Sequence, residues 1–278
     1  MATQVIADSS NEMNKDLMKE NPVEIVPFRL YLDGTEYVDD ENLNVIEFID
    51  IMMKSKTLPK SACPSPEEFM NKFKNDDDSY VVAISSKLSG TYNSAMLAKN
   101  LYLEDVKEKF IHVFDSKTAS VGETLVSLKI HELSKLGHTR DDLVVRVEKY
   151  IAEMKTFFVS ESLDNLMKNG RISKFKGTLA TALKIRPIMR ANDDGELEMV
   201  DKARGSAKAY NRLAEIIEEN ALNQEERVLA ISHVNNIDRA NWLKDEVEKR
   251  CNFKKIVVLQ TKGLSSLYCD NQGIIVAF

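Results

Sequence analysis

The most informative stretch of this sequence runs Tyr80-Val81-Val82-Ala83-Ile84-Ser85-Ser86-Lys87-Leu88-Ser89-Gly90-Thr91-Tyr92-Asn93-Ser94-Ala95. Residues 80–84 are apolar and mostly β-favouring, which is typical of a buried parallel strand and too short for a helix. A loop rich in hydroxyl groups follows, and residues 90–104 favour a helix. A strand, a polar loop and a helix N-terminus are the arrangement in which an open α/β sheet binds anions.

Two residues of this loop are candidate ligands for an anion. We expect Ser89 to cap the helix and Gly90 to let a ligand approach the backbone closely. Amide and hydroxyl groups would then converge on the anion, so that no positively charged side chain is needed to bind it. An ordinary strand–helix turn with a serine cap has the same sequence, so spacing alone leaves both interpretations open.

Composition narrows the class of protein. The chain has 278 residues, 43% of them hydrophobic, which is more typical of two domains than of one. Its net charge is −6 and it has no basic stripe with interleaved aromatic residues, so we expect no nucleic-acid partner. The cysteines (Cys63, Cys251 and Cys269) are odd in number and far apart, which indicates a reducing compartment. Residues 1–10 do not resemble a signal peptide and no apolar run approaches ~20 residues, so we expect a cytoplasmic protein without membrane insertion.

The order of expected elements predicts the fold class. Strands and helices alternate through residues 1–155, which predicts a mostly parallel sheet with helices on both faces. The predicted strands there are residues 5–7, 24–32, 80–84 and 110–115, and the helices are 14–20, 45–54, 90–104, 120–136 and 139–154. Ile46, Ile49 and Met53 give the helix at 45–54 its apolar spacing.

Residues 156–278 add an antiparallel component. The clearest hairpin joins predicted strands at 184–190 and 196–202 through Asn192-Asp193-Asp194-Gly195. Further strands are expected at 156–159, 228–232, 255–261 and 273–278, and helices at 163–168, 206–220 and 238–250. We therefore predict two α/β domains, residues 1–155 and 156–278, the second with a mixed sheet.

A second loop is held against a well-defined helix start. Ser65, Pro66 and Glu68 occupy the N-cap, N1 and N3 positions of a capping box. Residues 61–64 are then a loop whose side chains, Ser61 among them, are positioned by the helix. A capped helix without any ligand is the alternative.

Several common chemistries are missing from the sequence. It has neither of the usual glycine-rich nucleotide loops and no G-x-S-x-G elbow. His131 and His138 are expected on the surface, and His233 ends a predicted strand, where a ligand could lie. Asp8 and Asp115 also end strands and could bind Mg²⁺, although helix capping is the simpler interpretation. We predict no metal, no cofactor and no catalytic residue.

Several segments, taken in their order along the chain, resemble the DegV family of fatty-acid-binding proteins. They are residues 5–10, 84–95, 115–116, 169–173, 185–188 and 202–204. The resemblance implies two α/β domains with a fatty acid in an apolar tunnel between them and its carboxylate at the loops of the first domain. It also implies that the protein presents the acid to a separate fatty acid kinase, which makes the acyl-phosphate.

Single residues match the motifs of this family. Ser89 and Gly90 match the positions that bind the carboxylate, and Ser61 falls where the family usually has threonine. Arg171 matches the arginine of a G-R-I-S motif, which either binds near the head group or forms a structural pair. Arg204 matches the arginine of a K-x-R motif suited to a partner surface.

One region departs from the family. Many members carry an H-x-G-P-G loop near the C-terminus, whose histidine joins the head-group network. Residues 261–269 of this chain contain neither the histidine nor the proline–glycine pair. Lys262 or Ser265 could substitute for the histidine in the head-group network.

Three functions stay open at this point. The favoured one is a carrier of long-chain fatty acids. The alternative is a phosphotransferase or hydrolase that acts on a small anionic metabolite at the same loop, with Asp8, Asp115 and His233 as its groups. The third is a regulatory ligand sensor, which differs from the carrier only in what its protein partner does.

Overall fold

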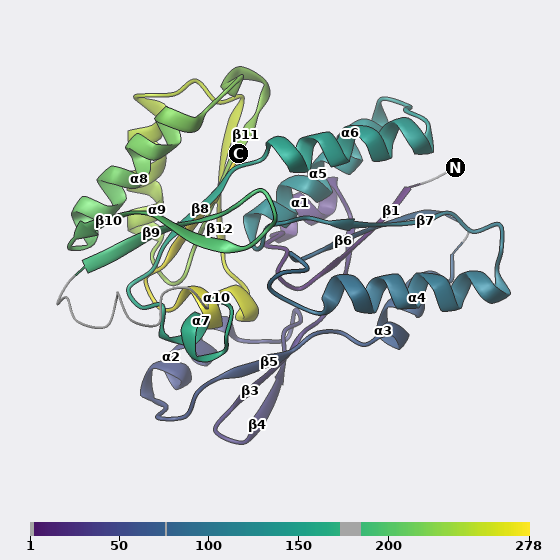
Figure 1. Cartoon of the computed structure of the whole chain (residues 1–278), viewed down its shortest axis with the longest axis horizontal. Helices are drawn as coiled ribbons and strands as arrows, with labels where there is room; N and C mark the ends of the chain where they lie inside the picture. The colour runs from purple at the N-terminus through teal and green to yellow at the C-terminus, as the bar shows by residue number, and fades with distance from the viewer. Residues whose placement is uncertain (1–2, 76, 173–184) are drawn as a thin grey trace.

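The computed structural model describes residues 3–75, 77–172 and 185–278 (Figure 1). Its strands are β1 (Thr3–Asp8), β2 (Val23–Val26), β3 (Arg29–Leu32), β4 (Thr35–Val38), β5 (Lys60–Ala62), β6 (Asp78–Ala83), β7 (Ile111–Asp115), β8 (Thr156–Val159), β9 (Ile185–Ala191), β10 (Leu197–Arg204), β11 (Val228–His233), β12 (Lys255–Gln260) and β13 (Ile274–Ala277). Its helices are α1 (Lys15–Glu20), α2 (Val45–Lys54), α3 (Pro66–Met70), α4 (Thr91–Asp105), α5 (Val121–Lys135), α6 (Arg140–Glu153), α7 (Asp164–Lys168), α8 (Ser206–Asn220), α9 (Ile237–Glu248) and α10 (Gly263–Cys269), with a 3-10 turn η1 at Gln224–Glu226.

The first sheet is parallel, as predicted. Its strand order is β2-β1-β6-β7, and each neighbouring pair runs in the same direction. Strand β6 is buried along its whole length, because helices cover both faces of the sheet. Figure 1 shows α4 on one side and α1, α5 and α6 on the other.

The second large sheet is mixed, which is also as predicted. Its strand order is β10-β9-β8-β13-β11-β12, and only β11 and β12 are parallel neighbours. Helices α8 and α9 pack on one of its faces. The opposite face contacts α5, which also packs on β1 and β6 of the first sheet. One helix therefore forms a layer shared by the two sheets, which explains why so many α5 side chains are buried.

The predicted strand at residues 24–32 is wrong, because it is broken in two. Strand β2 ends at Val26 and β3 begins at Arg29, with Pro27 between them. Proline has no amide N–H to continue a ladder, and β3 leaves to form a small antiparallel sheet, β4-β3-β5. Asp33 and Gly34 form the predicted turn of the β3–β4 hairpin, both with positive φ.

Two further predictions are corrected. Helix α2 has the predicted bounds, but Phe48, Ile49 and Met52 form its buried face, whereas Ile46 and Met53 are 57% and 54% exposed. The side packed against α10 determines this face, and α10 was not among the predicted helices. His131 is buried rather than on the surface, and its Nε2 lies 2.9 Å from the Pro22 carbonyl oxygen. Burial lowers the pKa of this imidazole.

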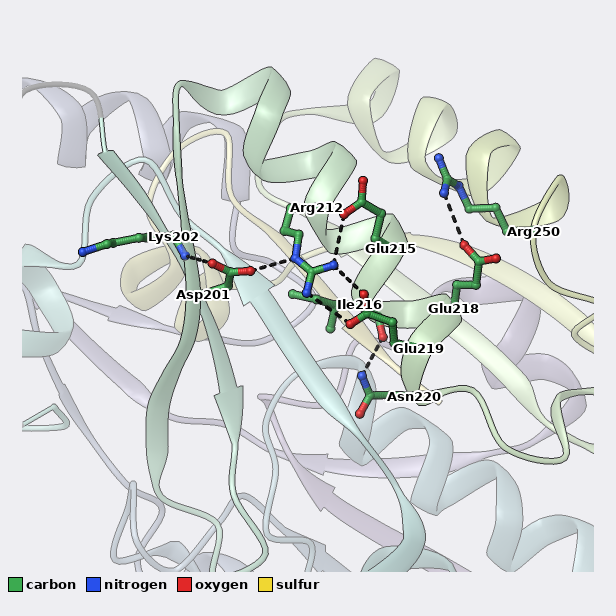
Figure 2. A network of polar contacts seen from close by, with 9 residues as sticks. All are labelled: Asp201, Lys202, Arg212, Glu215, Ile216, Glu218, Glu219, Asn220 and Arg250. Atoms are coloured by element: carbon green, nitrogen blue, oxygen red, sulfur yellow. Dashed lines mark hydrogen bonds and ion pairs between the residues drawn. The ribbon is translucent and has the colours of Figure 1, made fainter.

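Ion pairs fasten α8 to the edge of the mixed sheet (Figure 2). Arg212 of α8 donates from Nε to Asp201 of β10 at 2.7 Å and from Nη1 to Glu215 and Glu219 of its own helix. Arg250, just after α9, pairs with Glu218 of α8 at 3.3 Å, which links these two helices to each other. Because these side chains are partly exposed, each pair adds little energy.

Within the described part of the chain, no helix has both the length and the apolar character needed to cross a bilayer.

Candidate functional site

A pocket lies where the two large sheets meet. Its empty space amounts to about 770 Å³, part of which is open to solvent. The wall combines loops at the ends of β1, β6 and β7 with residues of β8, β13, α7 and α10. Its apolar residues are Phe28, Ile84, Leu88, Ala119, Phe158, Leu166, Ala191, Leu197, Leu264 and Ile275. Among the described residues of the wall, Arg171 alone carries a charge.

Three polar residues of the wall are in direct contact, and a fourth, Ser89, follows Leu88, whose carbonyl one of them binds. Ser61 Oγ lies 2.9 Å from the Tyr268 hydroxyl, and the Arg171 guanidinium lies 5.4 Å from the centre of the Tyr268 ring. Arg171 Nε donates to the Leu88 carbonyl at 3.3 Å, beside Ser89. The pocket therefore has one end with three hydroxyl groups and a cation, and we call Ser61, Ser89, Arg171 and Tyr268 the polar end.

Two carboxylates, one buried (Asp8) and one half-buried (Asp115), shape the loop that carries Ser89. Asp8 accepts hydrogen bonds from the amides of Ile84 and Ser10, both at 2.9 Å, and Asp115 accepts one from Ser86 at 3.0 Å. The expectation that these acids cap helices is therefore wrong: they hold the turn after β6 instead. The turn places Ser89 in the pocket wall.

The predicted N-cap is displaced by one residue. Gly90 is the N-cap of α4, whereas Ser89 Oγ lies 2.9 Å from Thr91 Oγ1 and 3.4 Å from the Thr91 amide. A Cβ on Gly90 would lie 3.4 Å from Cys63 Sγ, so its backbone passes close to the segment after β5. Ser61 itself lies in β5, paired with β3, and not in a loop as predicted.

Two more buried acids hold α10 in place. Asp39 accepts hydrogen bonds from the Gly263 and Leu264 amides at 2.7 and 2.9 Å. Glu12 accepts one from the Lys262 amide at 2.6 Å. These acceptors fix the start of the helix that carries Ser265 and Tyr268 into the pocket wall.

Burial changes the titration of these acids. It raises the pKa of Glu12 to about 8 and that of Asp8 to about 7. It also raises the pKa of Asp39, and it raises that of Glu123 far above its ordinary value. Neither oxygen of Glu123 makes a hydrogen bond of normal geometry with a described residue, although Asp8 and Ser10 lie close enough to influence its pKa. The pKa values of Glu12 and Asp8 thus lie near neutrality, which limits the charge buried behind the pocket.

The structure brings some of the predicted site residues together and leaves others apart. Ser61, Ser89, Arg171 and Ser265 line the pocket. The Ser265 side chain is buried and its Oγ makes no hydrogen bond of normal geometry with a described residue, although it lies close enough to influence Glu12.

The remaining predicted residues do not belong to the described pocket wall. Gly90 is exposed beside it, and Lys262 precedes α10. His233 is buried at the end of β11, where Nδ1 accepts a hydrogen bond from the Asn236 amide at 3.1 Å. Arg204 is exposed at the end of β10. Ser173 of the G-R-I-S motif and Lys184, where the predicted strand starts, lie outside the described residues.

Sequence reasoning missed Tyr268 altogether. Leu264, Leu267 and Tyr268 have the three- and four-residue spacing of a helix face, but the segment is short and rich in serine. Thr118 and Thr156, whose hydroxyls lie 2.8 Å apart in the wall, were missed as well.

Fold and pocket together define an α/β protein in which a parallel and a mixed sheet enclose an apolar pocket with a polar end. Comparison with known proteins makes this class more specific. The family model described as "Uncharacterised protein, DegV family" matches residues 2–272, so this chain belongs to the DegV family.

Relatives match over nearly the full length. A DegV domain-containing protein of Streptococcus gordonii is 33% identical over 281 residues, which is 100% of this chain and 99% of the relative. A DegV family protein of Ruminococcus gnavus, refined with vaccenic acid, is 39% identical with a TM-score of 0.96, covering 99% of both chains. The fatty acid kinase (Fak) B3 protein of Streptococcus pneumoniae, loaded with linoleic acid, is 31% identical with a TM-score of 0.91, covering 100% of this chain and 99% of that chain.

Proposed function

We propose that this protein binds one long-chain fatty acid in the pocket and carries it without chemically changing it. The carboxylate lies at Ser61 and at Ser89–Gly90, and the acyl chain lies against the apolar wall between the two α/β domains, which meet near residue 155. The observation that carries the proposal is the pocket itself: its apolar wall has one charged residue among those that the structure describes, a cation beside hydroxyl groups. Vaccenic and linoleic acid in the two similar structures support it.

The energetics assign different tasks to the two parts of the ligand. Each buried methylene contributes about 0.8 kcal/mol, so a dozen contribute on the order of 10 kcal/mol before the ligand is ordered. A hydrogen bond to a charged group contributes about 1.5–3 kcal/mol. The acyl chain therefore supplies most of the affinity, and the polar end determines the direction in which the acid enters.

Arg171 is suited to neutralise the carboxylate. Its Nη1 donates to the Asn169 carbonyl at 2.6 Å and its Nε to the Leu88 carbonyl, so two backbone oxygens fix the guanidinium. The sequence left two roles open for Arg171, binding near the head group or forming a structural pair. We assign it both, because it links two backbone segments and also lines the pocket.

The second part of the proposal concerns the partner. We assign to this chain the presentation of the acid to a separate fatty acid kinase in the cytoplasm, with the exposed Arg204 on the contacting surface. Adding the kinase and Mg-ATP to the loaded protein tests this part. Acyl-phosphate should form only when this chain is present, and Arg204→Glu should slow its formation without releasing the acid.

Native mass spectrometry tests the binding function. Protein purified from bacteria should carry the extra mass of one fatty acid, and delipidated protein should take up added acid with one-to-one stoichiometry. A bare polypeptide mass that does not change when acid is added would contradict the proposal.

The alternative of a phosphotransferase or hydrolase gains no support from the geometry. Asp8 and Asp115 accept hydrogen bonds from backbone amides, and His233 is bound to the Asn236 amide away from the pocket wall. A calorimetric titration of this chain with Mg-ATP tests the alternative. Heat of binding in the absence of any partner protein would favour a phosphotransferase.

A further inference from the structure

Tyr268 is the aromatic residue whose hydroxyl reaches the polar end of the pocket. Its side chain comes from α10, whereas its partner Ser61 lies in β5. The 2.9 Å contact between the two hydroxyls therefore joins the C-terminal part of the chain to the N-terminal part inside the proposed binding site.

The two hydroxyls form a directional donor. In the contact between Ser61 and Tyr268, one hydroxyl donates its proton and the other accepts it, and either residue can be the donor. The accepting hydroxyl still has its own proton, which it can donate to a ligand in the pocket. A carboxylate accepts up to about four hydrogen bonds, and a donor that itself accepts one is strengthened in a site of low dielectric. The pair thus offers an oriented O–H group to an anion.

The ring of Tyr268 adds a second contact. Arg171 lies over its face at 5.4 Å, a distance at which a cation is attracted to an aromatic ring. The same guanidinium is fixed by the Leu88 and Asn169 carbonyls. Tyr268 therefore touches both the hydroxyl and the cation that we place at the head group.

Hydrogen bonds at both ends of helix α10 fix the position of the Tyr268 side chain. Asp39 accepts both amides at its start, and Ser9 Oγ donates to the same carboxylate at 2.8 Å. At its end, Asn165 Nδ2 donates to the Leu267 carbonyl at 2.8 Å. A side chain held on a fixed element orients a ligand more precisely than one on a loop.

We infer that Tyr268 is a head-group residue: its hydroxyl donates to the fatty-acid carboxylate or positions Ser61 to do so, and it selects acids over uncharged lipids of the same length. This inference rests on the proposed binding function. It adds to that function a head-group residue that the sequence motifs did not identify and a selectivity for acids.

The test compares two ligands on one variant. Tyr268→Phe removes one oxygen and keeps the ring, so its affinity for a long-chain acid should fall about tenfold, whereas its affinity for the alcohol of equal chain length should change less than about twofold. Tyr37→Phe is the matched control, because Tyr37 packs on the same apolar cluster and lies outside the described pocket wall. The control should leave both affinities unchanged.

A double-mutant cycle separates a hydrogen-bonded pair from two independent residues. Ser61→Ala and Tyr268→Phe together should weaken acid binding by less than the product of their separate factors. An unchanged acid affinity in Tyr268→Phe, or equal losses for acid and alcohol, would overturn the inference while the binding function stands. Failure of the unmodified protein to bind either ligand would overturn the binding function itself.

Discussion

Ser85 Oγ donates a hydrogen bond of 2.8 Å to the carbonyl oxygen of Gly195, which joins the turn after β6 to the tip of the β9–β10 hairpin. Lys117 Nζ adds a second link, to the Asp193 carbonyl at 3.0 Å. The residues on either side of the hairpin tip, Ala191 and Leu197, line the pocket. The hairpin is therefore a wall of the pocket that is pinned to the parallel sheet at its tip.

The first prediction concerns this tip. Gly195 has a φ of +84°, and an added Cβ would lie 2.3 Å from Ser85 Oγ and 3.0 Å from Lys117 Cα. Gly195→Ala should lower the free energy of unfolding by about 2–5 kcal/mol, since left-handed strain and overlap act together. It should also speed the release of a bound acid, measured by stopped-flow displacement.

Gly34→Ala is the control for the strain alone. Gly34 has nearly the same φ, +80°, but nothing lies within 4 Å of an added Cβ. Gly34→Ala should lower the free energy of unfolding, measured by chemical denaturation, by only about 1–2 kcal/mol. It should leave the rate of acid release unchanged. If both variants lost the same free energy of unfolding, the hairpin tip would not be tightly packed against the loops that carry Ser85 and Lys117.

The second prediction concerns Ser89. Its hydroxyl accepts only a long hydrogen bond, 3.4 Å, from the Thr91 amide and Ser89 is not the N-cap of α4, so Ser89→Ala should leave thermal unfolding nearly unchanged. Acid binding should weaken about tenfold, because a hydrogen bond to a charged group is lost. Ser86→Ala, in the same loop but outside the described pocket wall, is the control for titration calorimetry. If Ser89→Ala unfolds more readily and keeps its lipid, Ser89 serves the fold and not the ligand.

The third prediction is a pH dependence of stability. Glu12 keeps its proton in the folded state up to about pH 8, whereas an unfolded glutamate loses it near 4.5. Unfolding therefore releases protons between these values, and the free energy of unfolding should fall as the pH rises from 5 to 8. Asp8, with a pKa of about 7, contributes with the same sign.

Glu123→Gln tests which buried carboxyl groups cause this pH dependence of the free energy of unfolding. The raised pKa of Glu123 has the same sign, so removing its titration should reduce the slope by up to about 1.4 kcal/mol per pH unit. Exposed Glu47→Gln is the control, and it should leave the slope as it was. A Glu123→Gln variant with the slope of the unmodified protein would show that this carboxyl is already ionised in the fold.

The fourth prediction concerns the acyl chain. Ala191 lies in the wall at the end of β9, so Ala191→Leu adds three carbons beside the pocket. The longest acid retained should become shorter, while a shorter acid binds with unchanged affinity. Competition between acids of graded length, followed by mass spectrometry, gives the result. An unchanged length preference would place the acyl chain away from this hairpin.

Much of the architecture follows from local sequence signals. The apolar run before Ser85 and the turn at Asn192–Gly195 each predict their elements, because strand burial and turn conformation depend on neighbouring residues. Ser89 was predicted from the loop between a strand and a helix, and Ser61 from the capped helix that follows it, in both cases together with the family resemblance; both line the pocket. The capping box at Ser65 is confirmed with both of its hydrogen bonds.

The rest depends on contacts between distant segments. The start of α10 is fixed by Asp39, an acid far away in sequence, and the short helix alone carries little signal. Tyr268 reaches the site only because this helix is held there. The strand predicted at residues 24–32 is interrupted at Pro27, and the departure of β3 into a separate sheet depends on its pairing with β5.

A crystal structure of the protein loaded with a long-chain acid tests the central claim most directly. The account predicts continuous density through the pocket, with a carboxylate oxygen within hydrogen-bond distance of Ser61 and Ser89 and the acyl chain against Ile84 and Phe158. An acid bound elsewhere, or bound with its carboxylate at Thr118 and Thr156 and its methyl end at Ser89, would contradict it.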